Sequence, residues 1–195
     1  MLASCGQHEK HIDNKWLPKS SQSTVILLQP LSSVPHQLLA MLKDSIPRYY
    51  PVSINIAAPV DLPVNAWYAP RGRYKADTLL TFLLKRKSNY RLIAGITTVD
   101  ISTTKDDNPD WGVMGFGYQP GQACVISTFR LKKDNPAEHV LFMRLMKTLL
   151  HEMGHNFGLA HCPNKQCIMA DAEGKLNQDN ETGLCAVCRR KLNLH

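Results

Sequence analysis

Two histidines separated by one helical turn give the sequence its clearest chemical signal. The string HEMGH at residues 151–155 places His151 and His155 four residues apart, so on a helix both imidazoles lie on the same face. Gly158 can turn the chain after the helix, and His161 follows three residues later as a third imidazole. The spacing of these three histidines predicts a zinc site.

Three neutral protein ligands leave the fourth tetrahedral position of a zinc ion for water, which distinguishes a catalytic site from a closed structural one. Glu152 lies between the two helical histidines but points to one side of them. Its carboxylate can accept a proton from the water and return it to a leaving amine. A surface carboxylate is the alternative for a lone glutamate, but it explains none of the histidine spacing. We therefore interpret Glu152 as the general base and acid of a hydrolysis.

Four of the six cysteines are grouped near the end of the chain: Cys162, Cys167, Cys185 and Cys188. Paired spacings of four and two intervening residues favour a structural zinc site. Two disulfides or four reduced core thiols are the alternatives. Because Cys162 directly follows His161, a zinc ion held by these thiolates would brace the loop that presents a ligand to the first site. We expect two zinc ions per chain, one catalytic and one structural.

Met169 lies eight residues beyond His161. Filling the core is the usual role of a methionine, so this residue alone is no evidence for a metal site. The string from His151 through Gly158 to His161, followed by Met169, resembles the metzincin metallopeptidase pattern, in which a methionine turn lies beneath the metal. Together with the four cysteines the pattern resembles the archaemetzincin family, most closely over residues 145–194. The resemblance departs from the family pattern in one respect: the loop 170–184 is slightly shorter.

The resemblance implies a zinc-dependent metallopeptidase that hydrolyses peptide bonds of a peptide or protein substrate by Glu152-assisted attack of zinc-bound water. It also implies a compact metzincin-like fold of the α/β (α+β) class. That fold has a twisted mixed sheet with an edge strand, an active-site helix, and a small C-terminal subdomain with the second zinc site. We expect a single catalytic domain over 24–195, with an upper subdomain at 24–158 and a lower one at 159–195.

Hydrophobic periodicity predicts the elements that position these residues. Strands are expected at 25–28, 52–57 and 90–101, and helices at 34–46 and 77–87, an alternation that favours a mixed sheet carrying helices. The glycine-rich segment 111–130 is typical of a hairpin or bulged edge strand, and we expect a substrate cleft between it and the active-site helix.

The active-site helix is expected to begin in a capping box, with Asn135 as the cap, Pro136 at the first position and Glu138 at the third. It should end near Phe157, where Gly158 offers a left-handed stop.

Composition limits the remaining classes of function. The 195 residues, with 44% hydrophobic and 20% charged residues, indicate one folded domain, because the usual size is about 100 to 200 residues per domain. No run approaches the roughly 18 apolar residues of a membrane-spanning helix. The net charge of +7 is scattered along the chain, so we expect no nucleic acid as partner. The oligomeric state is left open, with a monomer expected.

Two other functions are kept as alternatives. One is a non-catalytic zinc-binding protein that binds peptides without hydrolysing them. The other is a nucleic-acid-binding module that uses the four-cysteine site as a zinc finger, which would require Arg189, Arg190 and Lys191 to contact phosphates. Peptide turnover by a zinc-loaded sample would exclude the non-catalytic protein. A salt-sensitive shift of DNA mobility would support the nucleic-acid-binding module.

The N-terminal residues 1–23 are polar and are expected to form a flexible leader. Residues 2–5, LASC, resemble a bacterial lipoprotein cleavage box, yet no apolar signal region precedes them. As written, the sequence predicts a cytoplasmic protein. If the true start lies upstream, Cys5 would instead carry a lipid and anchor the domain at the cell envelope.

Overall fold

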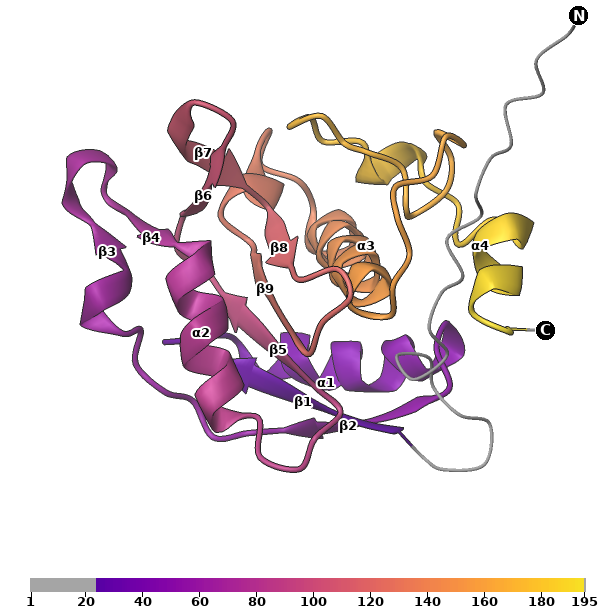
Figure 1. The fold of residues 1–195 in the computed structure, drawn as a ribbon, viewed down its shortest axis with the longest axis horizontal. Helices are drawn as coiled ribbons and strands as arrows, with labels where there is room; N and C mark the ends of the chain where they lie inside the picture. Colours follow the sequence, from indigo (N-terminus) through magenta and orange to yellow (C-terminus); the bar gives the residue numbers. More distant parts are fainter. Residues whose placement is uncertain (1–23, 195) are drawn as a thin grey trace, which may run out of the picture.

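The computed structural model describes residues 24–194, so the predicted leader at 1–23 and its Cys5 lie outside the described residues. The described chain forms two sheets and the helices that cover them (Figure 1). The larger sheet contains β1 (Thr24–Pro30), β2 (Val52–Ile56), β5 (Leu92–Thr97), β8 (Gly115–Gly117) and β9 (Ala123–Ser127). Its order is β2-β1-β5-β9-β8, with the first four strands parallel and β8 antiparallel to β9 at the edge.

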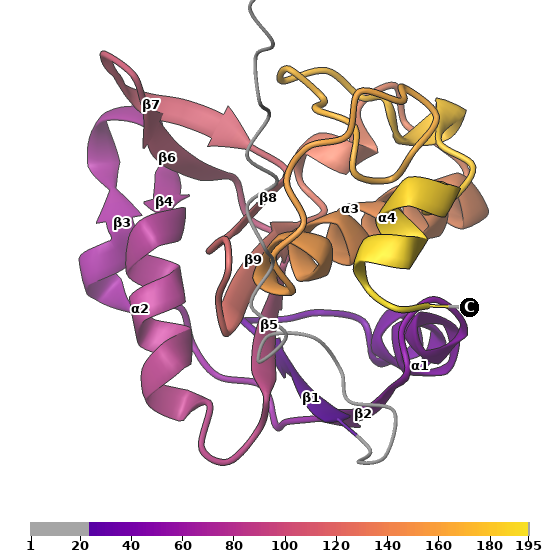
Figure 2. The ribbon, with the colours of Figure 1, turned by 45° about the vertical axis from the view of Figure 1, so that its right-hand side comes forward.

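Helices cover both faces of this sheet, as its buried strands require. The α-helices are α1 (His36–Ser45), α2 (Ala76–Arg86), α3 (Glu138–Asn156) and the short α4 (Ala186–Lys191). Figure 2 shows α2 on one side of the sheet and α1 and α3 on the other. Alternate residues of β1 divide accordingly: Ile26 and Leu28 pack in the core with α1 and α3, and Leu27 packs with α2. The mixed α/β architecture predicted from the alternation is confirmed.

A second, four-stranded sheet lies beside the first and was not predicted. It contains β3 (Trp67–Tyr68), β4 (Arg73–Lys75), β6 (Ile101–Lys105) and β7 (Asn108–Val113), in the order β3-β4-β6-β7. The single strand predicted at 90–101 is therefore β5 followed by the first residue of β6. The segment predicted as a hairpin at 111–130 begins with the end of β7, and the hairpin itself is β8 and β9.

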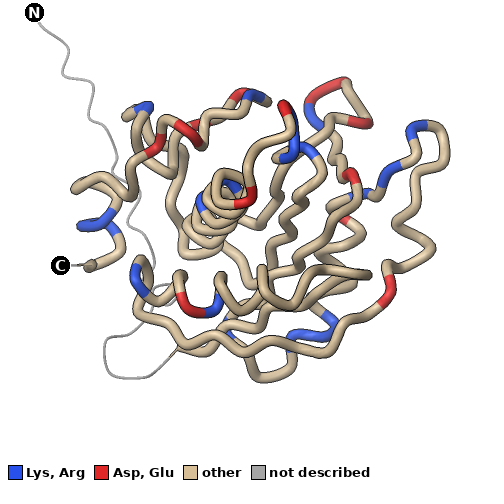
Figure 3. The backbone as a smooth tube through the Cα atoms, turned by 180° about the vertical axis from the view of Figure 1, so that it is seen from behind, with Lys and Arg blue, Asp and Glu red and all other residues tan. Residues whose placement is uncertain are grey.

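Short 3-10 helices complete the described chain: η2 (Ile46–Arg48), η3 (Val64–Ala66), η4 (Ala69–Arg71), η5 (Arg130–Lys132) and η6 (Gln178–Asn180). Basic and acidic residues are interspersed along the backbone (Figure 3). Within the described residues, no helix is both long enough and apolar enough to cross a membrane.

The two ends of α3 differ in how well the sequence predicted them. The capping box is wrong: Ala137 occupies the cap position without a side-chain bond, and Asn135 adopts a φ of 46°. The Asn135 backbone N–H instead donates to the Lys132 carbonyl, which closes the turn after η5. The predicted stop is confirmed, because Gly158 has a φ of 96° and its N–H donates to the His155 carbonyl at 2.8 Å.

Candidate zinc peptidase site

The three predicted histidines come together at the end of α3. The ring centroids of His151 and His155 are 4.6 Å apart, and the His161 ring, from the loop after Gly158, lies 5.4 and 4.9 Å from them. One candidate ligand atom from each histidine lies within 4.8 Å of the others. The structure therefore brings these side chains to one point.

Hydrogen bonds to backbone carbonyls orient the two helical imidazoles. His151 Nδ1 lies 2.6 Å from the Ile168 carbonyl oxygen, and His155 Nδ1 lies 2.8 Å from that of Leu159. Because a carbonyl only accepts, each Nδ1 carries the proton and each Nε2 presents a lone pair. The two Nε2 atoms are 2.9 Å apart.

Two lone pairs at this distance repel each other unless a proton or a metal ion binds to them. Burial lowers the pKa of His151 to about 4, and burial also lowers the pKa of His155, so neither ring holds a second proton at neutral pH. The donor set is therefore neutral imidazole nitrogen, which is a preferred ligand of zinc. The residues present fit a zinc ion.

The buried Met169 lies against α3 at Gly154. A Cβ built on Gly154 would lie only 2.4 Å from Met169 Sδ and 3.2 Å from the Tyr50 hydroxyl. The Tyr50 hydroxyl donates to the Leu150 carbonyl at 2.8 Å, so it contacts the same stretch of helix. Only a glycine at position 154 allows the methionine this close to the helix.

Glu152 lies on the side of α3 that faces the edge strand β8. Its side chain is buried, and burial raises the pKa of its carboxyl to about 8. A Cβ on Gly115 would lie 2.8 Å from Glu152 Oε1, and a Cβ on Gly117 would lie 3.2 Å from Oε2. The two glycines of β8 therefore make the space that the carboxylate occupies.

A cavity of about 1100 Å³ passes over this site. Its lining includes the three histidines, Glu152, the segment 111–117 and residues 170–179. The cleft that was expected between the glycine-rich segment and the active-site helix is thus present, and β8 is only partly covered.

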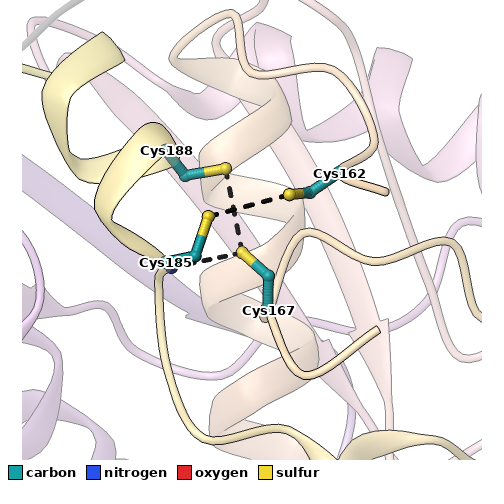
Figure 4. A group of neighbouring side chains, drawn as sticks. All are labelled: Cys162, Cys167, Cys185 and Cys188. Carbon is teal, nitrogen blue, oxygen red and sulfur yellow. Dashed lines mark hydrogen bonds between the residues drawn. The ribbon is translucent and has the colours of Figure 1, made fainter. Parts of the chain in front are cut away.

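The four C-terminal cysteines converge on a second point (Figure 4). Cys162 Sγ lies 3.7 Å from Cys185 Sγ, and Cys167 Sγ lies 3.7 Å from Cys188 Sγ. A disulfide requires about 2.05 Å, so the predicted alternative of two disulfides does not match these distances. A tetrahedral zinc with bonds of about 2.3 Å places its sulfur atoms about 3.8 Å apart. The cluster fits that geometry, with two cysteines from the loop after α3 and two from the start of α4.

Comparison with known proteins decides the family. The model of "Peptidase family M54" matches residues 38–194. The chain belongs to this family. It is 33% identical over 132 residues to the archaemetzincin of Methanopyrus kandleri, covering 67% of this chain and 72% of that protein. To the archaemetzincin of Methanocaldococcus jannaschii it is 30% identical over 172 residues, covering 86% and 92%.

Solved structures agree with this assignment. The crystal structure of the Methanopyrus kandleri archaemetzincin superposes with a TM-score of 0.78 at 26% identity, covering 91% of this chain and 97% of that one. The Archaeoglobus fulgidus archaemetzincin complexed with malonate gives a TM-score of 0.73 at 27% identity, covering 86% and 99%. The chain is thus a zinc metallopeptidase of the M54 family with the archaemetzincin fold.

One residue that positions the site of this M54 peptidase was missed by the sequence analysis. Asn156, directly after His155, is fully buried, and its Nδ2 donates to the carbonyls of Tyr118 at 2.8 Å and Ala123 at 2.9 Å. Its own carbonyl accepts from the Gly121 N–H at 3.1 Å. These bonds fasten the connection between β8 and β9 to the end of α3. Asparagine is common at helix ends as a cap, so its type alone gave no signal. The one clue in the sequence was its position directly after His155.

We expect Gly115→Ala to lower kcat/KM more than tenfold while zinc content remains at the wild-type level. The added methyl group would meet the Glu152 carboxylate and force it from its place, and a misplacement of about 1 Å can cost 100-fold in rate. Steady-state kinetics and metal analysis measure both quantities. Val125→Ala is the control, because this side chain of the paired strand β9 packs on the α2 side of the sheet and does not line the cavity. Equal losses in both variants would mean that the strand as a whole had been disrupted.

Proposed function

We propose that this protein hydrolyses peptide bonds at a zinc ion held by His151, His155 and His161, with Glu152 as the general base and acid. The observation that carries the proposal is the pair of facing Nε2 lone pairs, 2.9 Å apart, beside a buried carboxylate in an open cavity. A zinc ion bound there would supply Lewis acidity, lowering the pKa of the attacking water and polarising the scissile carbonyl.

Glu152 handles the protons in this mechanism. Burial that raises the pKa of its carboxyl makes the ionised form a stronger base than an exposed glutamate. The carboxylate accepts a proton from the attacking water and delivers it to the nitrogen of the leaving amine as the peptide bond breaks. The placement of Glu152 beside β8 supports this role, because a substrate that follows the edge strand passes next to the carboxylate.

We propose that the substrate binds as an extended chain along β8. The strand lies at the edge of its sheet, and an unpaired edge offers backbone donors and acceptors that match an extended peptide. Gly115 and Gly117 have no side chains to keep a substrate backbone at a distance.

N-methylation of a substrate backbone amide that pairs with β8 should raise KM about fivefold, because one hydrogen bond contributes roughly 1 kcal/mol. Kinetics with a series of peptides methylated at one position each would locate the pairing residues. The control is a peptide methylated at the terminus farthest from the cleaved bond. Equal KM values along the whole series would contradict strand pairing.

We further propose that the cysteine cluster holds a second, structural zinc ion, giving two per chain, and that residues 159–195 form a lower subdomain organised by it. The Cys162 N–H donates to the Met169 carbonyl at 2.7 Å, and the Ile168 carbonyl accepts from His151. The segment 162–169 thus adjoins both metal positions. Met169 would act as the methionine turn beneath the catalytic zinc.

We expect His155→Ala to lose the catalytic zinc and activity together while the fold and the second metal remain. The variant removes one neutral ligand from the three-histidine site and leaves all four thiolates in place. Zinc per chain should fall from two to one, with a melting temperature close to that of the wild type. His151→Ala and His161→Ala should behave alike. A variant that lost both metals would contradict the separation of the two sites.

The activity itself is tested with a peptide library and the zinc-loaded protein under reducing conditions, with products identified by mass spectrometry. Cleavage that disappears on chelation and returns with zinc supports the proposal. A zinc-loaded sample that binds peptides and leaves the whole library intact would overturn it.

A further inference from the structure

The third histidine differs from the other two in how it is held. His151 and His155 are fixed by backbone carbonyls, whereas the side chain of His161 is 49% exposed and its Nδ1 faces a carboxylate. That carboxylate belongs to Asp171, whose Oδ2 lies 3.5 Å from His161 Nδ1. Asp171 also lines the cavity, two residues beyond Met169.

Asp171 is itself held in place. Its Oδ1 accepts a hydrogen bond from the backbone N–H of Glu173 at 2.9 Å, which leaves Oδ2 directed at the imidazole. Its backbone position is set by the neighbouring bridge between Cys162 and Ala170. The segment that carries the histidine and the segment that carries the carboxylate are therefore paired with each other.

A carboxylate in this position has two effects on a histidine ligand. It favours the tautomer with the proton on Nδ1, which leaves the Nε2 lone pair free for a metal, and it increases the basicity of the ring. It also adds a negative charge beside a dication that would otherwise be held by three neutral ligands. The two buried histidines gain only a neutral carbonyl partner each.

We propose that Asp171 is a positioning residue that orients His161 and strengthens zinc binding at the catalytic site. The proposal rests on the three-histidine ligand set put forward above. Asp171 acts through His161 and makes no bond to the metal. Without it, the most exposed of the three ligands would rotate freely, and the site would release zinc more readily.

The test compares Asp171→Asn with Glu173→Gln in the full chain. Asparagine keeps an oxygen for the Glu173 N–H, so the turn is preserved while the charge facing His161 is lost. Glu173 lies on the same loop, and its carboxylate faces Lys165 at 3.7 Å, so Glu173→Gln removes a charge without touching His161. The readout is the dissociation constant of the catalytic zinc, measured by chelator competition, with activity measured separately.

We expect Asp171→Asn to weaken zinc binding at the histidine site about tenfold and Asp171→Ala up to 100-fold, the usual range for partners of metal ligands. Glu173→Gln should bind the catalytic zinc as tightly as the wild type does. Wild-type affinity in Asp171→Asn, or an equal loss in Glu173→Gln, overturns the proposal. A wild type that binds zinc but cleaves no peptide would defeat the proposed function alone, because the affinities of the variants remain measurable.

Discussion

Glu152→Gln is expected to lower kcat by about 100- to 10,000-fold, the usual contribution of a general acid and base, while zinc content and melting temperature stay near wild type. Glutamine has nearly the same shape and fits the space left by Gly115 and Gly117, but it cannot accept the proton of the attacking water. Cleavage of a peptide library by the variant beside the wild type measures the effect, together with metal analysis of both samples.

This comparison contains its own control. A contaminating protease would cleave the library in both samples, so only the difference between them belongs to this protein. Loss of zinc from Glu152→Gln would contradict the assignment, because it would make the carboxylate part of the metal site. Undiminished cleavage would show that another group handles the protons.

Cys185→Ser should destabilise the protein strongly and reduce activity indirectly. A structural zinc contributes roughly 10 to 16 kcal/mol of apparent binding free energy in zinc-finger peptides, against about 5 to 15 kcal/mol for the stability of a whole domain. Even a third of that contribution corresponds to a melting temperature lower by about 10 °C in a chain of this size. The segment 162–169 would lose the zinc–thiolate bonds that hold it in place, and His161 would be misplaced.

Thermal melting and zinc analysis under reducing conditions test this expectation. Val187→Ala is a matched control, since Val187 lies between Cys185 and Cys188 and is about half exposed. If the wild type holds only one zinc, or if Cys185→Ser melts like the wild type with both metals present, the assignment of a structural zinc site is wrong. Reduced core thiols would then be the better description.

Periodicity and ligand spacing made much of the fold and the metal positions predictable. The apolar run at 25–28 and the helical spacing at 34–46 correspond to β1 and α1, because each pattern is local to its own segment. Ile26, Leu28 and Leu42 then pack in the same core. The histidines were predictable because their geometry is local: two of them lie one turn apart on one helix, and the third follows its glycine stop.

The second sheet was not predictable because its strands are short or irregular and are joined by long-range pairing and ion pairs. Its strands β3 and β4 have two and three residues, too short for a period. Arg73 lies 3.1 Å from Asp100 and 3.2 Å from Asp110, while Arg130 pairs with Asp100 at 2.8 Å. These pairs join residues that are far apart in the sequence. The roles of Asn156 and Asp171 depend on tertiary proximity in the same way.

The position of the site along the chain has a consequence for biosynthesis. The strands of the five-stranded sheet all lie between residues 24 and 127, whereas every candidate ligand and Glu152 lie between residues 151 and 188. Because a chain emerges from the ribosome N-terminus first, the supporting layers are translated before any of the chemistry. A nascent chain that ends before Cys185 already carries all three histidines but lacks half of the thiolates that brace them. Peptidase activity is therefore expected only after Cys185 and Cys188 have been translated.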